Sequence, residues 1–92
     1  MKEIEVMCQV CNLSDALCRN INDNFKSVSF ELTDNGEIQT KIILHRLTEQ
    51  EKEFIEDIMA EFTASQNYDC ILKPIVEIGH STALKNIVYQ IL

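Results

Sequence analysis

The cysteines are the residues of this 92-residue chain whose chemistry is easiest to recognise. Cys8 and Cys11 form a Cys-x-x-Cys pair, and thiolates at this spacing can chelate one soft metal ion or form a redox couple where the backbone turns between them. Cys8, however, lies in a segment with alternating apolar residues. Because residues three apart on a strand point to opposite faces, we expect the two thiols not to converge. We interpret them as small buried apolar residues, and Cys18 and Cys70 likewise.

Met7 precedes this pair. A first strand, Met-Cys-x-x-Cys and a following helix resemble the start of the heavy-metal-associated domain, a metal carrier with a ferredoxin-like fold. The resemblance covers about the first 35 residues, and the glycine that normally precedes the Met is missing. It implies that Cys8 and Cys11 would hold a metal ion. A thiol-based metal carrier is therefore the alternative to the binding function favoured below.

A second group of residues with recognisable chemistry is acidic. Between Glu49 and Glu61 the chain has six acidic residues and one basic residue, Lys52. At about 100° per residue of helix, most of these acids lie opposite an apolar stripe that includes Phe54 and Ile58. Acids in a first helical turn complement the helix dipole, but that does not explain the later ones. The pattern predicts a docking face for a basic partner, with a plain solvated face as the open alternative. Its residues are Glu49, Glu53, Glu56, Asp57 and Glu61.

The overall charge points the same way. The net charge is −7, which disfavours binding to nucleic acid or to an anionic membrane and favours a basic protein partner. Neither His45 nor His80, which precedes Ser81, has the neighbours expected of a catalytic triad. The sequence also contains no phosphate-binding or metalloprotease motif. No apolar run is long enough to span a bilayer, and the start does not resemble a signal peptide. We therefore expect a cytoplasmic protein with reduced thiols, no catalytic residues and no cofactor.

The apolar periodicity predicts the elements that position these residues. Residues 3–10 alternate, as in a half-buried strand, and residues 13–24 have a helical stripe. One continuous helix from Ile4 to Asn24 is the competing interpretation. Residues 27–33 and 37–45 predict a β-hairpin around Asp34-Asn35-Gly36, and a capping box at Thr48 predicts a helix to about Ser65. Residues 69–78 favour a strand that lies at a sheet edge or carries a bulge, because Pro74 cannot donate to a ladder. For residues 83–92 we favour a strand over a helix.

This order, β-α-β-β-α-β plus a C-terminal element, is that of the ferredoxin-like fold. We therefore predict a single α+β domain over residues 1–92, with both helices on one face of an antiparallel sheet. The leading functional hypothesis is an acidic, non-enzymatic protein-binding module. Its most concrete form is an inhibitor or immunity-type protein that masks a basic surface, for example of a nucleic-acid-cleaving toxin. A small regulatory ligand-binding domain is a third hypothesis. A homodimer could form through an exposed strand edge.

Overall fold

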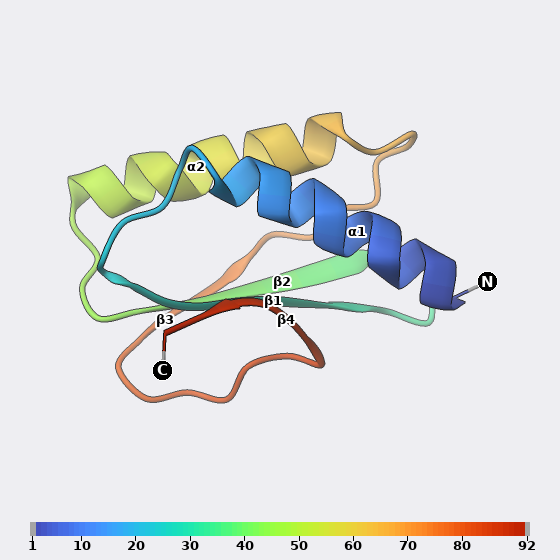
Figure 1. The fold of residues 1–92 in the computed structure, drawn as a ribbon. Coiled ribbons are helices and arrows are strands. Elements are labelled where there is room, and N and C mark those ends of the chain that lie inside the picture. The colour runs from blue at the N-terminus through green and yellow to red at the C-terminus, as the bar shows by residue number, and fades with distance from the viewer. Residues whose placement is uncertain (1, 92) are drawn as a thin grey trace.

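The computed structural model describes the backbone of residues 2–91 and the side chains of residues 5–91. Within that range the fold consists of two helices on one face of a four-stranded sheet (Figure 1). The sheet order is β3-β2-β1-β4, and the helices are α1 and α2. The α+β class and the placement of the helices agree with the sequence prediction. The elements are α1 (Lys2–Leu17), β1 (Phe25–Leu32), β2 (Ile38–Leu44), α2 (Glu49–Ala64), β3 (Ile75–Ile78) and β4 (Asn86–Gln90).

The predicted hairpin is confirmed. β1 and β2 pair antiparallel, with Leu32 opposite Ile38 at the turn and Phe25 opposite Leu44 at the far end. Gly36 adopts a φ of +78°, a left-handed conformation that L side chains rarely reach. The alternation places the apolar residues of both strands against the helices, where Phe25, Val28, Phe30, Ile38, Ile42 and Leu44 are fully or almost fully buried.

The helix predicted from the capping box is also confirmed. Thr48 is the N-cap of α2, and the Glu51 carboxylate accepts the Thr48 backbone N–H at 2.7 Å. The buried residues Ile55, Ile58 and Phe62 repeat every three or four positions and face the sheet. Because this side of α2 packs on the sheet, the opposite side of the helix faces solvent.

The strand predicted at residues 3–10 is wrong, because these residues belong to α1. Val6 and Val10 are two positions from their neighbours in an alternating pattern, but four positions from each other. A further step of three positions reaches Leu13, which is fully buried, so these residues follow the helical period. The helix predicted for residues 13–24 is likewise wrong in extent: α1 ends at Leu17, short of the Asn24 that the continuous-helix alternative required. Asn20 caps this end through a hydrogen bond from its amide to the Ala16 carbonyl at 2.9 Å.

The element order is therefore α-β-β-α-β-β, which differs from the predicted ferredoxin-like order. The sheet is mixed and not antiparallel throughout, because β3 pairs parallel with β2. β3 is an edge strand that begins directly after Pro74, and it covers only part of the predicted strand 69–78. Residues 86–90 of the tail form β4, which pairs antiparallel with β1 at the other edge.

The connection from β3 to β4 crosses the sheet face opposite the helices (Figure 1). Hydrogen bonds with the two central strands hold this crossing segment, residues 79–85. The Gly79 backbone N–H donates to the Leu44 carbonyl of β2 at 2.9 Å. Lys26 donates to the Gly79 carbonyl at 2.9 Å, and Lys41 donates to the Thr82 carbonyl at 2.7 Å. The Leu84 backbone N–H donates to the Ser29 hydroxyl at 2.9 Å. Neither helix within residues 2–91 is both long and apolar enough to cross a bilayer.

Candidate protein-docking surface

The solvent side of α2 presents three exposed carboxylates, those of Glu53, Glu56 and Asp57. Glu56 and Asp57 lie three and four positions after Glu53, so the three side chains project from neighbouring turns of the helix. Their orientation follows from the core, because Ile55 and Ile58 of the same turns are buried against the sheet. Among the side chains of residues 5–91, none lies within ion-pairing distance of these three carboxylates. We call Glu53, Glu56 and Asp57 the acidic triplet.

Glu49 and Glu61, at the two ends of the predicted docking face, have basic neighbours. Glu49 lies 3.3 Å from the ammonium group of Lys52, and both side chains are exposed. Such a pair is weak in water, so Glu49 remains available to a partner. Glu61 is half-buried and accepts hydrogen bonds from the Arg19 guanidinium and the Asn20 amide. The Arg19 hydrogen bond lowers the pKa of Glu61 and raises that of Arg19.

Glu61 therefore links α2 to the segment after α1, and its charge is compensated within the fold. The sequence could not reveal this link, because Arg19 and Glu61 are 42 positions apart. Of the five acids predicted to dock a partner, Glu61 is thus the one that is paired within the fold across two elements. The uncompensated part of the predicted docking face is the acidic triplet, with Glu49 at one end.

Glu51 is the acid of α2 that points inward, with only 1% of its surface exposed. Hydrogen bonds from the Thr48 hydroxyl, from Asn22 at 2.8 Å and from the Thr48 backbone N–H lower its pKa to about 2. Each of these donors stabilises the ionised form of the carboxylate. Glu51 thus anchors the start of α2 to the turn between α1 and β1, and it holds the acidic triplet on a fixed helix.

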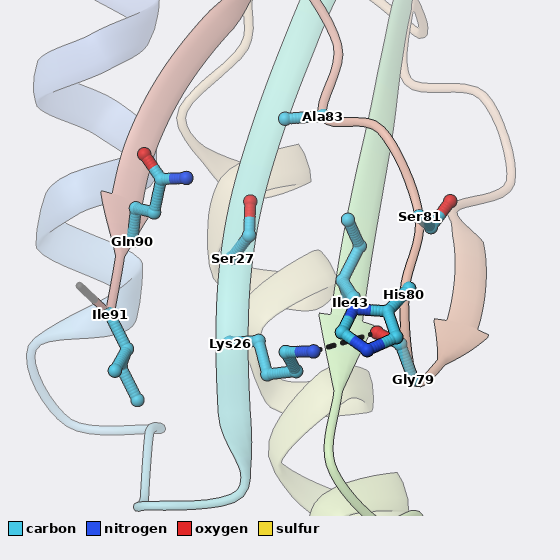
Figure 2. A pocket seen from close by; sticks show the side chains of 9 residues that line it. All are labelled: Lys26, Ser27, Ile43, Gly79, His80, Ser81, Ala83, Gln90 and Ile91. Atoms are coloured by element: carbon cyan, nitrogen blue, oxygen red, sulfur yellow. Dashed lines mark hydrogen bonds between the residues drawn. The ribbon is translucent and has the colours of Figure 1, made fainter.

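Two lysines lie on the opposite face of the sheet from the helices. Lys26 and Lys41 are directed to carbonyls of the crossing segment, and Lys41 also lies 3.7 Å from Glu77. Figure 2 shows Lys26 beside the ring of His80 in a pocket that this segment forms with β1. The buried Ser27 hydroxyl also lines this pocket, and no hydrogen-bond partner is found for it within residues 5–91. These lysines cannot neutralise the acidic triplet across the sheet.

The cysteines differ from the prediction. Cys8 and Cys11 lie one turn apart on α1 and both are exposed, so they are neither buried nor on opposite faces of a strand. Cys18 is also exposed, whereas Cys70 is buried as predicted. The strand and metal-binding loop implied by the resemblance to the heavy-metal-associated domain are absent from the described residues, where α1 continues through both positions. Within the same residues, no three His, Cys, Asp or Glu side chains cluster as metal ligands would.

The comparison with known families decides the classification. The profile of the MafI2 immunity protein family matches residues 4–90, which is nearly the whole chain. The chain belongs to the MafI2 immunity protein family. No curated protein shows a significant match. Immunity proteins act on a toxin partner, so membership in the MafI2 family supports the predicted immunity-type role and the predicted protein partner.

Proposed function

We propose that this MafI2 family member inhibits a nucleic-acid-cleaving toxin by covering the toxin's basic surface with the outer face of α2. The family match supports an immunity role. The exposed, uncompensated acidic triplet of Glu53, Glu56 and Asp57 supports the mode of binding and carries the proposal. Glu49 contributes at one end, and Glu61 keeps the helix in place through Arg19.

The chemistry of the proposed partner follows from its substrate. An enzyme that cleaves nucleic acid holds phosphate groups with Lys and Arg side chains. Carboxylates at successive turns of a helix can occupy the same cationic positions and exclude the phosphates. Opposite charge also accelerates encounter, by roughly 10-fold to 1,000-fold where the field is focused. Because Glu51 and Glu61 fix α2 to the rest of the fold, little ordering of the helix would oppose binding.

Charge reversal on the triplet tests this proposal. Glu53→Lys with Glu56→Lys should slow association with the cognate toxin by roughly 10-fold or more, measured by surface plasmon resonance at low salt. The matched control is Asp34→Lys with Asp69→Lys, which changes the net charge equally at exposed positions outside α2.

The control pair should retain most of the association rate. Equal losses in the two double variants would show that only total charge matters, and would remove α2 as the docking face. An unchanged rate in Glu53→Lys with Glu56→Lys would remove it as well. Inhibition of toxin cleavage by each variant, measured with a labelled nucleic acid, provides the functional readout.

A further inference from the structure

The two edges of the sheet differ in how they are protected. β3 follows Pro74 and carries Glu77, which pairs with Lys41, and both features discourage pairing with another strand. β4, Asn86–Gln90, contains no charged residue and no proline. Ile87 on β4 and Ile91 just after it are 47% and 45% exposed. β4 is therefore an edge that another strand can extend.

A groove runs beside this edge on the helix side of the sheet. The groove is predominantly apolar and lies between α1 and β4. Its lining residues are Ser14, Leu17, Cys18, Ile21, Val88 and Tyr89.

Three of those residues continue a longer stripe along α1 and the turn that follows it. We call it the α1 stripe; it has alternating spacings of four and three, as in a helix that packs against a second helix. Met7, at one end of it, is 67% exposed. The stripe consists of Met7, Cys11, Ser14, Cys18 and Ile21.

We propose that a second copy of this chain docks here, with β4 antiparallel to β4 and the α1 stripe facing the α1 stripe across a two-fold axis. Charge restricts where two copies can meet. The chain has a net charge of −7, so two copies repel each other wherever acids would meet. The α1 stripe and β4 contain no charged residue. An antiparallel edge pairs with its own copy by symmetry, which makes the contact self-complementary.

The irregular pairing of β4 limits how much of the dimer contact this strand can supply. The register shifts between the pairs Val28–Tyr89 and Ser29–Ile87, and Val88 is the additional residue of β4. Such a bulge shortens a regular ladder, so β4 can supply only a few main-chain hydrogen bonds. A stable interface needs about 1,000 Å² or more of buried surface. The α1 stripes must therefore supply most of the apolar area.

The proposed dimer leaves the toxin-facing side free. Asn20, after α1, hydrogen-bonds to Glu61 of α2, and Gln9 of α1 hydrogen-bonds to Gln66 in the turn that follows α2. Leu17 and Ile21 face the β4 groove instead. α1 thus separates the β4 edge from α2, and both copies would keep their acidic triplets accessible.

Sedimentation equilibrium of the full chain under reducing conditions tests the dimer. The expected mass at high concentration is twice the 10.6 kDa of one chain. Cys11→Glu and Cys18→Glu each place two like charges in the dimer interface, and should weaken dimerisation by about 100-fold or more. Gln50→Glu adds the same charge at an exposed position of α2, and should leave the dimer intact.

Hydrogen exchange supplies a second measurement. Amides of residues 86–91 should exchange more slowly as the concentration of wild-type chain rises, and this protection should be lost in Cys18→Glu. A mass of 10.6 kDa at every concentration would overturn the proposal, as would a dimer that both Glu substitutions leave intact. The result is separable from the toxin-binding proposal, because Glu53→Lys with Glu56→Lys should remain dimeric.

Discussion

At the scale of single residues, the acids of α2 have distinct roles that composition does not separate. Glu51 is buried and accepts hydrogen bonds, Glu61 is paired with Arg19, and Glu53 is exposed and unpaired within the described residues. The capping box allowed Glu51 to be recognised from sequence, because its spacing from Thr48 is local. The partners of Glu61 come from a distant part of the chain, and only the packing of α1 beside α2 brings them together.

Glu51 makes stability depend on pH in a defined window. Its pKa is about 2 in the folded chain, below the ordinary value of 4.5. The ionised Glu51 carboxylate therefore stabilises the folded state above pH 4.5, and this contribution is lost as pH falls from there towards 2. We expect urea denaturation at pH 7 and pH 3 to show a smaller pH effect in Glu51→Gln than in the wild-type chain. Glu49→Gln, at an exposed acid of the same turn, should retain the wild-type dependence.

At the scale of elements, local sequence motifs predicted the hairpin and α2 correctly, whereas the apolar periodicity of the first segment led to a wrong prediction. Asp34-Asn35-Gly36 and the Thr48 capping box each specify a structure within a few residues, and both predictions are confirmed. The first segment contained two overlapping periods, because Val6 and Val10 fit both alternation and a helical stripe. Leu13 is buried in the core, and α1 contacts both α2 and β4; these tertiary contacts favour the helix, and the sequence alone does not reveal them. The parallel pairing of β2 with β3 also depends on a long connection rather than on local residues.

The role of α1 in the core leads to a further prediction. Leu13 is fully buried, one turn before the C-terminal end of α1. Leu13→Ala should lower the free energy of unfolding by about 2–5 kcal/mol, because it removes apolar contacts and leaves a cavity. Cys8→Ala on the exposed side of the same helix should change it by less than about 0.5 kcal/mol. Equal effects in chemical denaturation would contradict the assignment of these two faces.

At the scale of the whole molecule, charge and apolar surface are separated. The acidic triplet lies on α2, the uncharged α1 stripe borders β4, and Lys26 and Lys41 hold the crossing segment on the other face of the sheet. The sequence predicted the acidic face and an exposed strand edge. It could not place the lysines, because their carbonyl partners lie in residues 79–85.

This separation predicts opposite responses to salt. Association with the toxin should slow steeply as ionic strength rises from about 0.1 M to about 1 M, where the Debye length falls from about 10 Å to about 3 Å. Self-association should persist or strengthen over the same range, because screening reduces repulsion between two acidic chains. Parallel titrations by stopped-flow mixing and by sedimentation would show both trends. A shared response would contradict two distinct surfaces.

The pairing of β4 with β1 has a consequence for synthesis on the ribosome. β1 belongs to an early hairpin, yet its second neighbour arrives only when residues 86–90 have emerged. Until then the nascent chain exposes the hydrogen-bonding groups of β1 that will pair with β4. The crossing segment is also not yet in place to cover the face of the sheet opposite the helices. Newly made chains are thus open to wrong strand pairing during this interval. Rapid completion of translation through residue 90 would shorten it.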